Sequence, residues 1–326
     1  MESKKESSRD KPGTPPNSSK GISINIGLNR VDPVHYDGWS GQLAACEFDA
    51  RDLYAIAQQM GFTSTLLLTA NATAQAVLDA LSDAANKLNG GDILLLTYSG
   101  HGSQVPDTNS DEIDDLDETW VLYDRQLVDD ELVAMFSQFK AGVRIFVLSD
   151  SCHSGTVARM MEYRAVKQAV ATLPARATRV LPRGRRRVPR ASQSGFSADA
   201  ATWAPFRQRP RRVKSPPPAV RYNTYSENQQ LYDGIQDKYP KGDKARVNAS
   251  VILISGCQDN QLSSDGFRNG LFTGQLRRVW RNGAFTGNYR RFHRQIRRRM
   301  PAIQSPNYFT YGAVNEDFEN QTPFTI

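Results

Sequence analysis

The stretch VRIFVLSDSCHSG, residues 143–155, is an apolar run that breaks into small and polar residues. A second stretch of the same design, DILLLTYSGHG, occupies residues 92–102. Continuous apolar runs of this length, bounded by glycine, are typical of strands buried on both faces of a parallel sheet. Both runs end in residues with reactive side chains, which predicts a site beyond the carboxyl ends of the strands.

Segments of strand and helix character alternate around these two runs. Further strands are expected at 21–29, 64–70, 119–124 and 247–261, with an edge strand within 305–314. Helices are expected at 43–60, 73–91, 127–142, 269–283 and 288–300, the second of them capped by Thr73. This alternation predicts an α/β fold with a mostly parallel central sheet of about six strands and helices on both faces.

Composition divides the chain into four parts. Residues 1–20 form a polar, disordered tail, 21–160 the larger portion of the core, 161–246 a basic Arg/Pro-rich flexible insertion, and 247–326 a smaller C-terminal portion. Between 161 and 221 there are 15 Lys and Arg against 2 Asp and Glu, a net charge of +13, whereas the whole chain carries +7. The basic character is therefore local.

Several classes of protein do not fit the sequence. The N-terminus lacks the apolar stretch of a secretory signal, and no apolar run approaches the ~20 residues of a membrane span. The three cysteines are widely spaced and form no CxxC pair, which argues against a disulfide framework and a zinc site. We expect a cytoplasmic protein that does not bind membranes.

The pair Cys152 and His153 invites a catalytic interpretation, because a cysteine nucleophile needs a nearby base. Adjacent side chains at a strand end point to opposite sides, however, so His153 is poorly placed to act on Cys152. His101 ends the other apolar run, 51 residues earlier, and would meet Cys152 if the two strands are neighbours. The alternatives are a buried structural thiol and a turn histidine. We assign His35 and His293 to packing or to the surface.

The stretches YSGHGSQ and DSCHSGT resemble the two active-site signatures of the metacaspase branch of the caspase-like cysteine peptidases. LAACEFDARDL is similar to an early helix of that family, and SGCQDNQLSSD, NGLFTGQL and SPNYFTYG resemble its smaller C-terminal portion. The resemblance covers residues 21–160 and 246–326 and implies a caspase-like sandwich. It also implies a Cys152 nucleophile and a His101 acid/base, with the amides of Gly102 and Cys152 as the oxyanion hole.

Acidic residues near the thiol predict the preferred substrate. Asp150 precedes Cys152 by two residues, so both side chains would project to the same side, and a carboxylate there would select Arg or Lys before the scissile bond. The resemblance adds Asp49 and Ser99 to this pocket. The alternative for Asp49 is a solvated acid in the first turn of a helix.

The acidic stretch DTNSDEIDDLDE, residues 107–118, is expected to be a loop and suggests calcium. It is not an EF-hand, because Glu112 stands where the sharp turn needs glycine and a strand precedes it. The resemblance instead implies an activating Ca²⁺ site of Asp117, Asp129 and Asp130. A further acid that some members carry after the nucleophile has no match at 157–159, and a merely solvated loop is the alternative. No organic cofactor is expected.

The basic insertion has two interpretations. Its exposed arginines suit self-processing by an enzyme that cuts after Arg or Lys, with cuts between 164 and 221. Arginine density also suits phosphates, but few aromatic residues interleave it, so we expect processing and no nucleic-acid partner. We therefore expect a cysteine endopeptidase acting on protein or peptide substrates, and the resemblance implies a monomer. The alternative is a catalytically silent caspase-like scaffold that binds through the basic segment.

Overall fold

The fold is built on a central sheet, seen in a computed structural model that describes residues 19–108, 116–151, 213–239, 246–257, 265 and 268–326. The strands of this sheet are β1 (Gly21–Gly27), β2 (Thr63–Leu68), β3 (Ile93–Ser99), β7 (Arg144–Asp150), β8 (Ser250–Ser255) and β9 (Asn307–Gly312). They lie in the order β2-β1-β3-β7-β8-β9, and every neighbouring pair is parallel except β8 and β9. The prediction of a mostly parallel sheet of six strands is confirmed.

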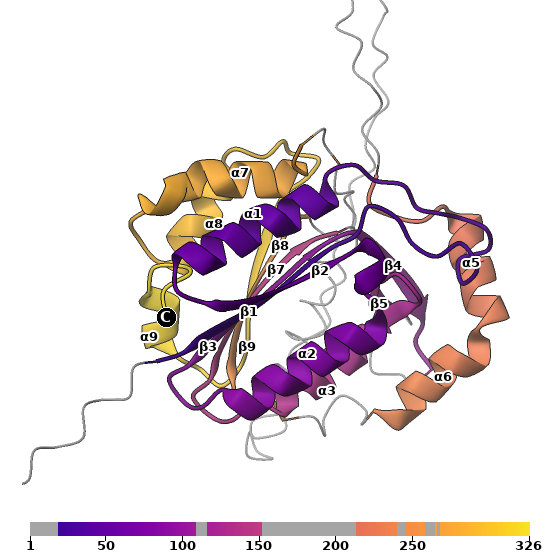
Figure 1. Cartoon of the computed structure of the whole chain (residues 1–326), viewed down its shortest axis with the longest axis horizontal. Helices are drawn as coiled ribbons and strands as arrows, with labels where there is room; N and C mark the ends of the chain where they lie inside the picture. The colour runs from indigo at the N-terminus through magenta and orange to yellow at the C-terminus, as the bar shows by residue number, and fades with distance from the viewer. Residues whose placement is uncertain (1–18, 109–115, 152–212, 240–245, 258–264, 266–267) are drawn as a thin grey trace, which may run out of the picture.

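Helices cover both faces of this sheet (Figure 1). One face packs against α2 (Ala74–Lys87) and α3 (Asp129–Ser137), and the other against α1 (Cys46–Gln59), α7 (Leu271–Trp280) and α8 (Tyr289–Arg297). Alternate residues of β3 divide between the faces: Leu94 and Leu96 join the first core, and Ile93 and Leu95 the second. The predicted two-sided covering is therefore correct.

The local sequence explains how α2 begins and packs. Thr73 lies before its first residue and its side-chain oxygen accepts a hydrogen bond from the backbone N–H of Ala76, as the sequence predicts. Val77, Leu81 and Ala84 then recur at helical spacing and are completely buried. After the helix, Gly91 adopts a φ of +92°, a conformation that glycine takes without steric cost. Short 3₁₀ turns lie at η1 (Thr69–Asn71) and η2 (Arg281–Gly283).

A small antiparallel sheet lies beside the end of β3. It consists of β4 (His101–Pro106), β5 (Leu116–Val121) and β6 (Gln126–Val128), and only Gly100 separates β3 from β4. The structure corrects the predicted loop at 107–118, since Leu116, Asp117 and Glu118 belong to β5. Asp and Glu are depleted in strands, which is why the sequence favours a loop there.

Two helices lie within the segment that was expected to be a flexible insertion. These are α5 (Pro218–Glu227) and α6 (Gln229–Lys238), and we call residues 213–239 the strap. Tyr232 of α6 is fully buried against Val105 and Val128, so the strap is packed on the domain and not flexible. In Figure 1 the strap lies beside β4 and β5. The remainder of the predicted insertion, 161–212 and 240–245, lies outside the described residues, as does most of the N-terminal tail.

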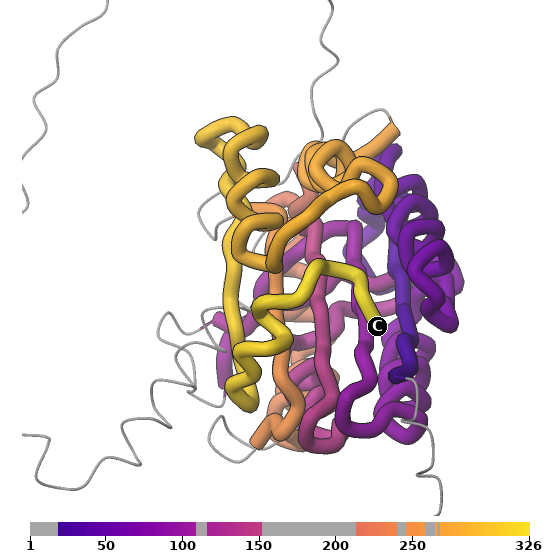
Figure 2. The backbone as a smooth tube through the Cα atoms, turned by 90° about the vertical axis from the view of Figure 1, so that its left-hand side faces the viewer, coloured from indigo at the N-terminus to yellow at the C-terminus, as the bar shows by residue number. Residues whose placement is uncertain are grey.

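The C-terminal segment completes the second core. Helix α9 (Glu316–Asn320) contributes Phe318, and Phe324 follows it into the same cluster. Figure 2 shows this segment in yellow crossing the strands. The last residue, Ile326, lies against Gly21 at the start of β1. Among the helices described, none has the length and apolar character needed to span a membrane.

Candidate active site

Two predicted site residues stand side by side at the carboxyl ends of neighbouring strands. Ser99 ends β3 and Asp150 ends β7, and the register of the parallel pair places them opposite each other. This confirms the expectation that the two apolar runs are neighbours. Both side chains are buried, as is usual in a sheet that is covered on both faces.

A lysine that the sequence analysis did not single out occupies the space between the predicted pocket residues. The ammonium nitrogen Nζ of Lys214, in the strap, lies 3.0 Å from Asp150 Oδ2 and 3.6 Å from Asp49 Oδ2. It also donates hydrogen bonds to Ser99 Oγ (2.9 Å) and to the backbone oxygen of Asp150 (3.1 Å). Lys214 is fully buried, so this cation has exchanged its water for protein oxygens.

Asp49 reaches the same space from the first turn of α1. Its carboxylate accepts hydrogen bonds from Ser99 Oγ (2.8 Å), from Asn269 Nδ2 (3.0 Å) and from the backbone N–H of Gly270 (3.0 Å). The side chain is fully buried, which excludes the alternative of a solvated helix acid. Asp49, Ser99 and Asp150 thus gather around one cation, and their role in binding a substrate stays a prediction.

Burial and charge act in opposite directions on these groups. Burial raises the pKa of Asp49 to about 6, although the Lys214 ammonium and the hydrogen bonds to its carboxylate oppose that rise. Burial alone would lower the pKa of Lys214, but the carboxylates of Asp150 and Asp49 hold it well above its ordinary value. The lysine is therefore charged at neutral pH, and the pocket is complementary to a cation.

The main chain of Lys214 is held as firmly as its side chain. The backbone N–H of Gly102 donates a hydrogen bond of 3.0 Å to the carbonyl oxygen of Lys214. Gly102 is the residue whose amide was predicted to stabilise an oxyanion. A carbonyl oxygen accepting from this amide is polarised at the bond that joins Lys214 to Ser215.

His101 precedes Gly102 in the chain, and its side chain is buried. Its Nε2 lies 2.8 Å from the carbonyl oxygen of Gly41, and its ring packs on Trp39 with 4.7 Å between the ring centroids. The carbonyl of Gly41 requires a proton on Nε2, which leaves Nδ1 as the nitrogen able to accept a proton. Burial lowers the pKa of His101 to about 4, so the imidazole is neutral at pH 7.

Tyr98 fixes the backbone that carries His101. Its hydroxyl lies 2.7 Å from the carbonyl oxygen of His101 and 3.0 Å from that of Val121. The Tyr98 ring stacks on Trp120, whose indole N–H donates to Ser149 of β7. These contacts tie β3, β4, β5 and β7 together at the site.

The nucleophile that was predicted lies outside this description. Cys152 and its neighbour His153 are outside the described residues, so their predicted roles stay predictions. The other two histidines have packing contacts, as expected. His35 Nε2 lies 2.7 Å from the hydroxyl of Tyr232, and His293 Nε2 lies 2.9 Å from the carbonyl oxygen of Pro306.

The three residues predicted to bind Ca²⁺ are buried near β5 and the start of α3. Asp117 lies in β5, and Asp129 and Asp130 are the first residues of α3. Within the part of the chain that the structure describes, no three or more His, Cys, Asp or Glu side chains are grouped so as to hold a metal. The neighbouring stretch 109–115 is outside the described residues, and the calcium site stays a prediction.

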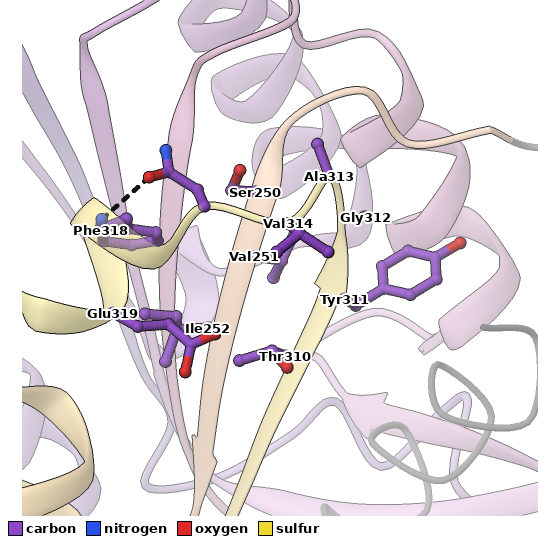
Figure 3. Close-up of a pocket in the computed structure, with 11 residues that line it drawn as sticks. Ser250, Val251, Ile252, Thr310, Tyr311, Gly312, Ala313, Val314, Phe318 and Glu319 are labelled. Atoms are coloured by element: carbon purple, nitrogen blue, oxygen red, sulfur yellow. Dashed lines mark hydrogen bonds between the residues drawn. The ribbon is translucent and has the colours of Figure 1, made fainter. Parts of the chain in front are cut away.

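A separate surface pocket lies at the other end of the sheet and has no part in this site. Figure 3 shows it between the start of β8, at Ser250, and the end of β9 and α9, with Asn315 accepting a hydrogen bond from the backbone N–H of Phe318. Ser255, at the far end of β8, marks the end of the sheet where Asp150 lies. The pocket therefore lies away from the gathered polar groups.

Three residues of the site were missed by sequence reasoning. Lys214 lies in a Pro- and Arg-rich stretch without hydrophobic periodicity, and its neighbours RRVKSPPP give no sign of burial. Asn269 and Gly270 precede α7 in a motif that was noted only as a family resemblance. A run of three prolines that begins a helix at Pro218 is the one local signal near Lys214.

Comparison with known proteins places most of the chain in one family. Residues 31–317 match the caspase domain of the C14 peptidases. The chain is 32% identical over 209 residues to metacaspase-1 of Schizosaccharomyces pombe and 28% identical over 270 residues to metacaspase-1 of Kluyveromyces lactis. These matches take in 63% and 74% of this chain, but the chain spans only 44% and 55% of the two relatives.

A solved structure matches over nearly the full length. It is the crystal structure of protein GSU0716 from Geobacter sulfurreducens, with 48% sequence identity and a TM-score of 0.74. The match covers 94% of this chain and 98% of that one. The fold described above therefore has an experimental counterpart of similar length.

Proposed function

The chain belongs to the caspase-domain family, and from that premise we propose that it is a cysteine endopeptidase of the metacaspase type that cleaves after Lys or Arg. The docking of Lys214 carries this proposal. Its ammonium lies between Asp49 and Asp150, and its carbonyl oxygen accepts from the N–H of Gly102. A substrate residue before the scissile bond needs the same two interactions, one for recognition and one for polarising the carbonyl.

The proposed reaction is a two-step acyl transfer. His101 takes the proton of the Cys152 thiol, and the thiolate attacks the carbonyl carbon while Gly102 and Cys152 amides stabilise the oxyanion. His101 then gives the proton to the leaving amine, the C–N bond breaks, and an acyl-enzyme remains. Water, deprotonated by His101, attacks this thioester, and the released thiolate regains its proton.

The state of His101 is suited to this role. With its pKa lowered to about 4 by burial, the imidazole is neutral at pH 7 and can accept a proton. Its Nε2 is engaged by Gly41, which orients the ring and leaves Nδ1 for proton transfer.

Self-processing is part of the proposal, and the bond between Lys214 and Ser215 is the favoured site. Lys214 already occupies the pocket with its carbonyl oxygen on Gly102, so attack on this bond needs no diffusion of substrate. Until it is cut, the same residue excludes other substrates from the pocket. The bond lies within the range of 164 to 221 expected for processing.

Calcium activation is a separate part of the proposal. Asp117 in β5 and Asp129 and Asp130 in α3 carry buried carboxylates, and carboxylate oxygens are the ligands that Ca²⁺ prefers. Ca²⁺ usually takes about six to eight oxygens, however, and the described residues do not supply a finished cage. No step of the reaction is therefore assigned to the ion.

The decisive experiment compares the wild-type chain with Cys152→Ala on peptides that carry Lys, Arg or Asp before the bond, with and without Ca²⁺. We expect Lys and Arg peptides to be cleaved by the wild type only, and mass mapping to show a cut after Lys214. The control is Ser82→Ala, on α2 and away from the pocket, and it should keep its activity. Preference for Asp would refute the pocket assignment.

The alternative, a silent scaffold, makes opposite predictions in the same experiment. No peptide would be cleaved under any calcium condition, no fragment would appear, and Cys152→Ala would be indistinguishable from the wild type. Binding of nucleic acid that weakens with salt would then support the scaffold.

A further inference from the structure

The floor of the Lys214 pocket is formed by the turn Asn269–Gly270, which precedes α7. We propose that Gly270 sets the depth of this pocket and that Asn269 is a positioning residue for Asp49, so that this turn decides which cationic side chains are accepted before the scissile bond. The inference rests on the proposed function, because it concerns the specificity of the same site. The turn lies 220 residues after Asp49 in the chain and belongs to the C-terminal portion.

Asn269 connects the pocket to a pair of surface charges. Its Nδ2 donates to Asp49 Oδ1 (3.0 Å) and to Asp52 Oδ2 (2.8 Å), and its Oδ1 accepts from Arg277 Nη1 (3.1 Å). Arg277 in turn pairs with Asp52 at 2.7 Å. The amide is thus held at both ends, with its amino group turned toward the carboxylates, and Asp49 is held in one orientation.

Gly270 lies against the ammonium group itself. A Cβ atom at this position would lie 2.5 Å from Asp150 Oδ2, 2.9 Å from Asp49 Oδ2 and 2.9 Å from Lys214 Nζ. The backbone angles, φ −56° and ψ 155°, are ones that any amino acid adopts. Glycine therefore leaves space here and is not needed for conformation, and a side chain would displace the ends of Asp150, Asp49 and Lys214.

The occupant fills the pocket to this floor. The Lys214 ammonium donates hydrogen bonds to Ser99 Oγ and to the Asp150 carbonyl, and it forms an ion pair with Asp150 Oδ2. A side chain added at residue 270 would take the volume of the ammonium and of the carboxylate that pairs with it. A substrate with a shorter cationic side chain would lose less affinity in such a variant, because its charged end does not reach residue 270.

The test uses the full chain with Gly270→Ala and peptides that differ only in the residue before the bond: Lys, Arg or ornithine. Ornithine is lysine shortened by one methylene. We expect kcat/KM for Lys and Arg to fall by at least about tenfold and the ornithine-to-Lys ratio to rise about tenfold, since one methylene in a pocket is worth roughly 10- to 200-fold. An equal fall in kcat/KM for all three peptides, or no fall, would show that Gly270 does not set the depth of the pocket.

Gly274→Ala on α7 is the matched control. A Cβ there would have Asn269 Cβ, at 3.7 Å, as its nearest neighbour, which is an ordinary contact, so the three rates should be unchanged. Failure of the proposed function is distinguishable, because it would leave the wild type itself inactive on Lys and Arg peptides. In that case the ornithine-to-Lys ratio of kcat/KM could not be measured for any variant.

Asn269→Ala provides a second test, should Gly270→Ala fold poorly. The Asn269 amide lowers the pKa of Asp49, so its removal should shift the acid limb of kcat/KM for the Lys peptide to higher pH. KM should rise more than kcat falls, because the residue acts through Asp49. Asn320→Ala, at the exposed last residue of α9, is its control. An unshifted acid limb would overturn the positioning role.

Discussion

The pocket and its occupant are held in the molecule in different ways. Ser99 and Asp150 are fixed by the register of β3 and β7, in the middle of the six-stranded sheet. Lys214 belongs to the strap, which is held by the packing of Tyr232 and by side-chain hydrogen bonds, such as that of Gln236 to the carbonyl oxygen of Pro106 (2.9 Å). Release of the occupant therefore needs the strap to separate from the domain, whereas a change in the walls, Ser99 and Asp150, needs the sheet itself to break.

The largest effect is expected from removing the occupant. Lys214→Gln should abolish the cut after residue 214, because an amide cannot replace the cation between Asp49 and Asp150. It should also lower the free energy of unfolding by about 3–5 kcal/mol, the usual result of breaking a buried ion pair. Mass mapping and thermal unfolding measure both.

The control for this change is Lys238→Gln, an exposed lysine of the same strap, which should behave as the wild type. The proposed role of Lys214 would be wrong if the chain were still cut between residues 214 and 215.

The next largest effect comes from changing a wall while the occupant is kept. Asp150→Asn should lower kcat/KM for Lys and Arg peptides at least about 100-fold, about 2.7 kcal/mol in transition-state binding, because a charged partner of the cation is lost. Asp83→Asn, an exposed residue that pairs with Lys87, is the control and should have no effect. An unchanged kcat/KM in Asp150→Asn would show that Asp150 does not recognise the Lys or Arg side chain of the substrate.

The pH dependence of kcat/KM distinguishes the pocket residue Asp49 from the proposed base His101. As pH falls from 7.5 to 5, Asp49, with its pKa raised to about 6, gains a proton, and kcat/KM for a Lys peptide should fall about tenfold. His101, with a pKa of about 4, stays neutral over most of this range. Asp49→Asn should therefore lack this acid limb, and a persisting limb would assign it to another group.

The same shift predicts how stability varies with pH. Because the pKa of Asp49 is raised from 3.8 in the unfolded chain to about 6, the fold favours its protonated form. The contribution of Asp49 to the free energy of unfolding is full below about pH 4 and is lost as pH rises through about 6.

The smallest effect tests the anchor of the strap. Tyr232→Phe removes the hydroxyl that lies 2.7 Å from His35 Nε2 and 3.2 Å from the backbone nitrogen of Gln126. A lost hydrogen bond is worth about 1 kcal/mol, so the fraction of molecules with an open strap should rise about fivefold. Hydrogen exchange of residues 216–239 in the Cys152→Ala background measures this, with exposed Tyr222→Phe as the control. Equal hydrogen exchange in the Tyr232→Phe and Tyr222→Phe proteins would show that the Tyr232 hydroxyl does not hold the strap.

The walls of the site could be predicted from the sequence, and the occupant and floor could not. Ser99, His101 and Asp150 follow apolar runs that identify strand ends, so their positions are set by local patterning. Lys214 and Gly270 reach the site through tertiary packing alone. A lysine after arginines and before prolines has the composition of an exposed linker, and only the buried carboxylates explain why it is inside.

The fold shows the same division. The six strands and the cap at Thr73 follow from periodicity and hydrogen-bonding chemistry. Only the first half of β5 did not, because Asp117 and Glu118 are polar residues buried within it. Helix α6 was missed as well, since its buried residues are only Tyr232 and Gln236, too few to give an apolar periodicity.

The pairing of β7 with β8 has a consequence for a chain cut after Lys214. The cut falls between these two strands in sequence, yet six register pairs from Arg144 with Ser250 to Ser149 with Ser255 join them in the sheet. The two fragments would stay together in one cooperative body and separate only when it unfolds. Unfolding would then release two molecules where the intact chain releases one, so the melting temperature would rise with protein concentration only after processing.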